Sequence, residues 1–151
     1  MLNQFSRTQL LLGKEAMDRL KGARVAVFGI GGVGGYVCEA LVRSGVGAID
    51  LIDDDKVCLT NLNRQIIATR KTIGKYKTDV MEERIHDINP DVSVVTHRCF
   101  FLPENADEFP FEEYDYIVDA VDTVTAKNAR IVNEGKIFHG SIVIENEVIA
   151  E

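Results

Sequence analysis

Apolar residues recur along the chain at two spacings, and each spacing predicts a different kind of element. In segment 32–44, Val33, Val37, Ala40 and Leu41 fall on one face of a helix. Segments 24–29 and 48–53 are instead short apolar runs flanked by glycine or charged residues, which is typical of buried strands. The pattern predicts, in chain order, helix 8–20, strand 24–29, helix 32–44, strand 48–53, helix 75–88, strand 92–97, strand 114–120, helix 125–134 and strand 136–144.

This alternation of strands and helices predicts the fold class. It favours an α/β, Rossmann-like, doubly wound and mostly parallel sheet with helices on both faces. No repeat, low-complexity tract or linker rich in proline, glycine and serine interrupts the chain, so we expect one nucleotide-binding domain over residues 1–151. With 46% of its 151 residues hydrophobic, the chain can bury a core without disulfide or metal support.

The cysteines and the N-terminus bear on the cellular compartment. Cys38, Cys58 and Cys99 show no pairing spacing, and no signal segment opens the chain, which together favour the reducing cytoplasm. The longest apolar stretch, 25–42, is rich in glycine and contains Glu39, so it fits a strand, turn and helix better than a membrane span. We therefore expect no association with a membrane.

Charge is distributed unevenly along the chain. The net charge of -7 argues against a general nucleic-acid binder, and residues 101–151 alone carry 12 acidic and 3 basic residues. In contrast, no acidic residue occurs between Lys56 and Thr78, a segment that also holds Arg64, Lys75 and Lys77. A cationic segment on an acidic chain indicates an anion-binding site, although a run of solvated charges is the simpler alternative.

Glycines 29, 31, 32 and 34 form the sharpest local motif. Gly29-Ile-Gly31-Gly32-Val-Gly34 joins a predicted strand directly to a predicted helix. Such a turn brings backbone N–H groups and the positive end of a helix to a phosphate, whereas its alternative role is close packing of strand and helix. Because Asp53 ends the next strand, where an acid would bind the ribose of NAD, an NAD-dependent oxidoreductase remains a possible interpretation.

The residues after the second strand favour ATP over NAD. An enzyme that attacks the α-phosphate of ATP must neutralise charge on the departing diphosphate, and Arg64 and Lys77 fit that role. Asp122, which follows the fourth predicted strand, is suited to hold Mg²⁺, although it could equally cap the next helix. The cofactors expected from these residues are ATP and Mg²⁺.

Four motifs follow one another along the chain: the glycine turn 29–34, Asp53-x-Asp55 with Asn61-Leu-Asn-Arg-Gln65, Lys77, and Asp119-x-x-Asp122. In these motifs the sequence resembles the adenylate-forming superfamily of ThiF, MoeB and HesA, relatives of the ubiquitin-activating enzymes. The resemblance covers about residues 5–127, and 128–151 match no part of the family pattern that we can place. It implies that Arg7 enters the ATP site of a partner subunit in a homodimer. The positions that it implies for nucleotide and metal binding are Gly29, Gly31, Gly32, Gly34, Asp53, Asp55, Asn61, Arg64, Gln65, Lys77 and Asp122.

Within that superfamily, the motifs around Arg7 and Asp122-Thr123 are most similar to those of the tRNA threonylcarbamoyladenosine dehydratases. This resemblance implies ATP-dependent activation of a carboxylate on a modified adenosine of tRNA, followed by ring closure, with no catalytic cysteine. It also implies possible partner proteins of the cysteine desulfurase type. The alternatives left open are a sulfur-carrier adenylyltransferase, the oxidoreductase, and a nucleotide-binding fragment without activity.

Overall fold

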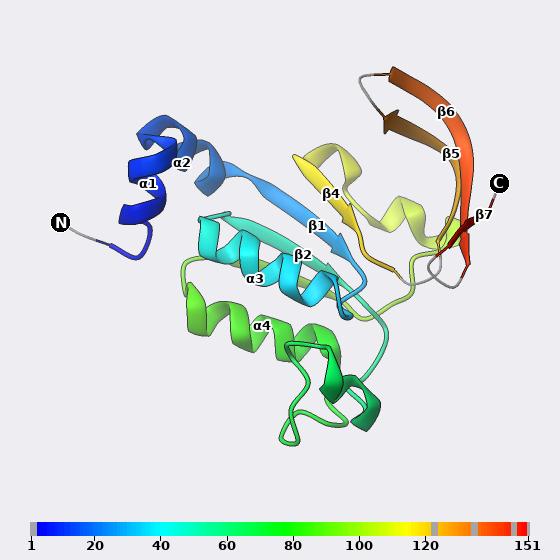
Figure 1. The fold of residues 1–151 in the computed structure, drawn as a ribbon, viewed down its shortest axis with the longest axis horizontal. Coiled ribbons are helices and arrows are strands. Elements are labelled where there is room, and N and C mark those ends of the chain that lie inside the picture. The colour runs from blue at the N-terminus through cyan, green and yellow to red at the C-terminus, as the bar shows by residue number, and fades with distance from the viewer. Residues whose placement is uncertain (1–2, 122–123, 134–135, 146–147, 151) are drawn as a thin grey trace. The chain divides into compact units, whose positions relative to one another are not determined.

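The computed structural model describes residues 3–121, 124–133, 136–145 and 148–150, which divide into two compact units, 1–120 and 121–151. The first unit contains a four-stranded sheet in the order β3-β2-β1-β4, and every neighbouring pair is parallel. This confirms the α/β, Rossmann-like class. The sheet and its α-helices comprise β1 (Arg24–Phe28), α3 (Gly34–Ser44), β2 (Ala48–Ile52), α4 (Lys77–Ile88), β3 (Ser93–His97) and β4 (Tyr116–Asp119) (Figure 1).

The two faces of the sheet are covered differently. Val27 and Leu51 belong to a core shared with Cys38 of α3 and Met81 of α4, so both α-helices pack on one face. On the other face, Phe28 packs against aromatic rings of the β3–β4 connection, which contains the short 3-10 helices η2 (Pro103–Glu108) and η3 (Phe111–Glu113). In the described part of the chain, this second cover is therefore made of 3-10 turns.

A buried carboxylate anchors the second face. Asp50, only 1% exposed, accepts hydrogen bonds from Arg24 Nε (2.8 Å) and Tyr114 Oη (3.0 Å), and lies 3.1 Å from His97 Nε2. Burial alone would raise the pKa of Asp50, but its hydrogen bonds with Arg24, His97 and Tyr114 outweigh burial and lower it. The group thus stays ionised and ties three strands and the connection together.

The expected helix 8–20 is wrong in one respect, because the structure divides it. α1 (Ser6–Leu12) ends at Gly13, and α2 (Lys14–Gly22) starts directly after it. Gly13 has φ +82°, a left-handed conformation that ends a helix and that side-chain-bearing residues rarely adopt. Gly13 therefore interrupts the helix where the apolar spacing predicted a continuous one.

The second unit is an antiparallel sheet of β5 (Val124–Asn133), β6 (Lys136–Glu145) and β7 (Val148–Ala150). The expected helix 125–134 is wrong, whereas the expected strand 136–144 is confirmed. Val124, Thr125, Ile131 and Val132 are β-branched, which favours an extended backbone, and both ends of β5 pair with β6, with a register shift between Ala126 and Ala129. Among the described helices, none is both long and apolar enough to cross a membrane.

Candidate nucleotide site

The glycine turn lies where the strand order of the sheet reverses. The chain passes from β1 to β2 on one side of β1, and from β3 to β4 on the other side of β1. A crevice is therefore expected outside the carboxyl end of β1. Gly29 continues directly from β1 with φ +86°, and its N–H donates to the carbonyl oxygen of Ile52 (2.8 Å). A Cβ at Gly34 would lie 1.8 Å from the carbonyl oxygen of Gly29, so only glycine fits there. The strand therefore turns into α3 with backbone packed on backbone.

Gly31 and Gly32 have room for a side chain that Gly34 lacks. A Cβ at Gly31 would meet nothing closer than Gln65 Nε2 at 3.9 Å, and one at Gly32 would lie 3.6 Å from the Arg64 side chain. These glycines are therefore not required by packing, and their bare backbone leaves space for a ligand to approach closely. Arg64 and Gln65, expected from the sequence to belong to the site, are brought beside the turn.

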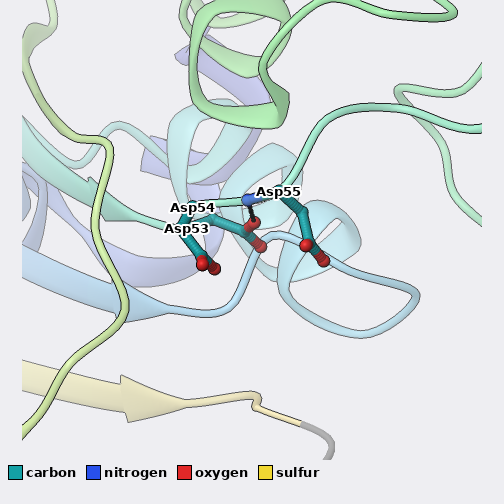
Figure 2. Close-up of side chains that lie close together, drawn as sticks. All are labelled: Asp53, Asp54 and Asp55. Carbon is teal, nitrogen blue, oxygen red and sulfur yellow. Dashed lines mark hydrogen bonds between the residues drawn. The ribbon is translucent and has the colours of Figure 1, made fainter.

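Asp53 fastens the turn to the end of β2. Its Oδ2 accepts the backbone N–H of Ile30 (2.7 Å), and its Oδ1 accepts the backbone N–H of Asp55 (2.8 Å). Figure 2 shows Asp53, Asp54 and Asp55 together at this end of the strand, with their carboxylate groups within 4.8 Å of one another. Because both oxygens of Asp53 accept backbone hydrogen bonds, this carboxylate positions the turn.

Lys77, the first residue of α4, also contacts the carboxylate of Asp53. Its Nζ is 2.7 Å from Asp55 Oδ2 and 3.5 Å from Asp53 Oδ2, and the residue is only 6% exposed. The backbone N–H of Lys77 also donates to the carbonyl oxygen of Asp55 (3.0 Å). The ammonium group is thus held near the glycine turn by two carboxylates, one buried and one exposed.

Asn61 and Gln65 shape the loop that faces the turn. Asn61 Oδ1 accepts the N–H of Cys58 (3.0 Å), and the Asn61 carbonyl oxygen accepts the N–H of Gln65 (2.9 Å), which holds η1 (Leu59–Asn63) in place. Gln65 is 6% exposed, yet its Oε1 is buried without a hydrogen-bond partner. An unpaired buried acceptor costs about 1–3 kcal/mol, so a donor from a ligand or water would be stabilising there.

Arg64 differs from Lys77 because it is exposed and has no carboxylate partner in the described residues. Its Nη1 donates to the Thr60 carbonyl oxygen and to Asn63 Oδ1, both at 3.2 Å. These are bonds to neutral groups, which a guanidinium can exchange for bonds to an anion at little cost. The site therefore contains two cations: Arg64, which pairs with no carboxylate in the described residues, and Lys77, which pairs with Asp53 and Asp55.

Of the two remaining expected site residues, one lies outside the described residues and the other lies away from the turn. Asp122 lies outside the described residues. Arg7 is exposed on α1, and the neighbouring segment contacts the far ends of α3 and α4: Gln4 Nε2 donates to Asn89 Oδ1 (3.0 Å), and Phe5 carbon lies 3.5 Å from a Cβ built at Gly45. Gly45 and Asn89 cap the carboxyl ends of these helices, whereas the turn and Lys77 lie at their amino ends.

Sequence reasoning missed one feature of this loop. Cys58 is exposed, and its Sγ lies 3.0 Å from Thr60 Oγ1. The hydrogen bond with Thr60 lowers the pKa of the Cys58 thiol. The sequence offers no adjacent histidine or paired cation as a signal, because the partner comes from the local 3-10 turn.

Comparisons with known proteins point to the same part of the molecule. A model of the ThiF family matches residues 5–150. The tRNA threonylcarbamoyladenosine dehydratase of Bacillus subtilis (strain 168) is 48% identical over 127 residues, which are 84% of this chain and 50% of that protein. A sulfur carrier protein adenylyltransferase of Thermus thermophilus is 34% identical over 145 residues, covering 95% of this chain and 52% of that protein.

A solved structure adds a bound nucleotide to this comparison. The E. coli tRNA N6-threonylcarbamoyladenosine dehydratase, TcdA, crystallised in complex with ATP, superposes with a TM-score of 0.78 at 45% identity, over 80% of this chain and 50% of that one. The chain thus spans about half the length of the relatives that it matches.

Proposed function

The chain belongs to the ThiF family, and from this premise we propose that it uses ATP to activate a carboxylate on the threonylcarbamoyl group of a modified adenosine in tRNA. The observation that carries the proposal is the grouping of Gly31 and Gly32 with Arg64 and Lys77. An open glycine turn suits a polyphosphate, and two cations suit the departure of diphosphate from it. The names of the most similar relatives support the choice of tRNA as substrate.

The reaction that these residues would serve has two steps. In the first, a carboxylate oxygen of the substrate attacks the α-phosphorus of ATP, the bond to the β-phosphate breaks, and diphosphate leaves. In the second, an atom of the carbamoyl group attacks the activated carbonyl carbon, and AMP leaves as the ring closes. Arg64 and Lys77 would neutralise the charge that builds on the diphosphate, so no protein nucleophile is needed.

Magnesium belongs to this proposal through Asp122. The open glycines and the unpaired Gln65 Oε1 fit a nucleotide, and a carboxylate beside its phosphates would suit Mg²⁺, a cation that takes oxygen ligands. When bound, the ion would neutralise phosphate charge. Asp53 holds the turn through Ile30 and Asp55, and we propose Asp122, which follows β4 in the sequence, as the carboxylate for this role.

The nucleotide preference gives a direct test. We expect ATP with Mg²⁺ to raise the melting temperature of the protein, and NAD or NADH to leave it unchanged, because two cations beside the turn match a triphosphate rather than a nicotinamide. The measurement is a thermal shift over a panel of nucleotides, with EDTA as the control for magnesium. Equal shifts with ATP and NADH would reverse the choice of nucleotide.

The substrate is tested by mass spectrometry of tRNA. Incubation of tRNA carrying threonylcarbamoyladenosine with the protein, ATP and Mg²⁺ should convert the nucleoside to a product lighter by one water, with AMP formed in equal amount. A second candidate, adenylation of a sulfur-carrier protein, is favoured by the match to the Thermus thermophilus adenylyltransferase over 95% of the chain. In that case, diphosphate exchange would depend on a carrier protein and not on tRNA.

We also propose that the active unit is a homodimer in which Arg7 reaches the ATP site of the partner subunit. This proposal is supported by the position of α1 at the carboxyl ends of α3 and α4, away from the glycine turn of its own subunit. A two-fold contact would let one segment serve both sites.

Mixing two inactive variants tests this arrangement. Arg7→Ala and Asp122→Asn are each expected to be inactive alone. In a mixed dimer, one site lacks both groups and the other keeps both, so activity should reappear when the subunits are combined and allowed to exchange. Mixed dimers that form but remain inactive would remove the role of Arg7 in the partner's site.

A further inference from the structure

The segment 56–77, which leads from the end of β2 to α4, contains further cations besides Arg64 and Lys77 of the nucleotide site. In this stretch, Lys77 pairs with Asp53 and Asp55, Lys75 Nζ lies 3.4 Å from Glu83 Oε2, and Lys56 Nζ lies 4.7 Å from the centroid of the Tyr76 ring. Arg70 and Lys71 are both exposed, and within the described part of the chain their side chains have neither an ion pair nor a hydrogen bond. Arg64 and Lys56 also lack an ion pair in the described residues, but Arg64 donates hydrogen bonds within its own loop and Lys56 lies over the Tyr76 ring.

The turn that carries Arg70 and Lys71 is braced by threonines on both sides. Thr72 Oγ1 accepts the N–H of Thr69 (2.8 Å) and donates to the carbonyl oxygen of Ile67 (2.8 Å). The N–H of Thr72 also donates to the Thr69 carbonyl oxygen (3.1 Å), which closes the turn around Arg70 and Lys71. Ile67 is 2% exposed and anchors this turn in the core. A preformed turn lowers the entropy lost when its side chains bind a partner.

The same segment reaches the nucleotide site at its other end. Gln65 and Arg64 lie beside Gly31 and Gly32, and the N–H of Ala68 donates to the Gln65 carbonyl oxygen (3.0 Å). Arg64 and Gln65 contact the glycine turn, and five residues after Gln65 the same loop, which precedes α4 in Figure 1, reaches Arg70. A substrate whose reacting group lies at the glycine turn has its neighbouring groups within reach of this loop.

From these observations we infer that the turn of Arg70 and Lys71 binds the phosphate backbone of the RNA substrate near its modified nucleoside. The inference rests on the proposed function, because it takes tRNA as that substrate. On a chain with a net charge of -7, two unpaired cations in a rigid turn complement a polyanion. Of the two carboxylates that line the same small groove as Thr69 and Thr72, Glu83 pairs with Lys75, whereas Asp87 has no ion pair in the described residues. Backbone contacts of this kind position RNA without reading its sequence.

The test compares Arg70→Ala/Lys71→Ala with a matched control. The control is Lys14→Ala/Lys21→Ala, which also removes two cations, from α2. Affinity for tRNA carrying threonylcarbamoyladenosine is measured by fluorescence anisotropy at several salt concentrations, and affinity for ATP by calorimetry. We expect the first variant to bind tRNA about tenfold to a hundredfold more weakly, with a salt dependence of log Kd reduced by about 1 to 2, and ATP affinity unchanged.

The control should retain both affinities, and the charge-conserving Arg70→Lys/Lys71→Arg should restore tRNA binding. If Arg70→Ala/Lys71→Ala binds tRNA with unchanged affinity and salt dependence, or loses ATP affinity as well, the inference is overturned while the proposed function stands. If the unsubstituted protein binds ATP but no tRNA, the proposal that tRNA is the substrate is wrong, and so is the inference that Arg70 and Lys71 bind RNA.

Discussion

Gly34→Ala is expected to destabilise the protein by about 3 kcal/mol or more and to lower its melting temperature by about 10 °C. The added Cβ would lie 1.8 Å from the carbonyl oxygen of Gly29 and 2.9 Å from its carbonyl carbon. Both atoms belong to the backbone of the turn, so no flexible side chain can move aside. The turn itself must open, and with it the hydrogen bond from Gly29 to Ile52 that continues the sheet. Thermal unfolding monitored by circular dichroism measures the loss.

Gly31→Ala is the matched control for this prediction. It adds the same methyl group three residues earlier, where the nearest atom is 3.9 Å away and packing is not disturbed. We expect its melting temperature to stay close to that of the unsubstituted protein, whereas its affinity for ATP should fall at least about tenfold, because the methyl occupies the space for the phosphates. Retained ATP affinity in Gly31→Ala would mean that phosphate does not approach this face of the turn.

The contrast between these glycines shows how far the sequence could be interpreted. The motif predicted a phosphate-binding turn between a strand and a helix, and the structure has that turn between β1 and α3. The spacing did not distinguish Gly34, which packing requires, from Gly31, which packing does not. That distinction depends on how closely the start of α3 approaches Gly29, which is a property of the folded backbone.

The same limit explains the errors in the predicted elements. The parallel sheet was predictable because each strand is a short apolar run separated by turn residues or a helix. The helix 8–20 was not, since one glycine with φ +82° interrupts an otherwise continuous apolar spacing. The helix 125–134 failed because small and charged residues in its centre fit a helical spacing, while its β-branched ends and its pairing with β6 favour a strand.

Within the site, the sequence identified residue types but not their partners. Lys77 was expected to meet phosphate directly, and the structure adds that Asp55 and Asp53 hold it at 2.7 and 3.5 Å. These contacts join segments 22 and 24 residues apart, and they form only after β2 and α4 pack together. The unpaired Oε1 of Gln65 is likewise invisible to spacing, because it results from burial without a neighbouring donor.

Removal of either cation is expected to slow adenylate formation by about a hundredfold or more, with a smaller effect on ATP affinity. The negative charge that Lys77 and Arg64 face is greatest when diphosphate departs, so both side chains should stabilise the transition state more than bound ATP. The variants are Arg64→Ala and Lys77→Met. Methionine retains the length of the buried Lys77 stem up to Cε and removes the ammonium group with its hydrogen bond to Asp55. Exchange of labelled diphosphate into ATP, in the presence of the modified tRNA, measures the rate.

Lys75→Met is the matched control for Lys77→Met, since it removes a lysine charge two residues earlier that pairs with Glu83 on the surface. With tRNA at saturating concentration, it should leave the exchange rate close to that of the unsubstituted protein. The melting temperature separates chemistry from folding: loss of the Lys77 charge leaves Asp53 with hydrogen bonds from Ile30 and Asp55 but without its cation, so some stability is lost as well. Lys77→Arg restores the positive charge and should recover stability, and it should recover the rate only if the guanidinium reaches the same position. Full exchange activity in both Arg64→Ala and Lys77→Met would mean that these cations serve a different surface and that charge on the diphosphate is neutralised elsewhere.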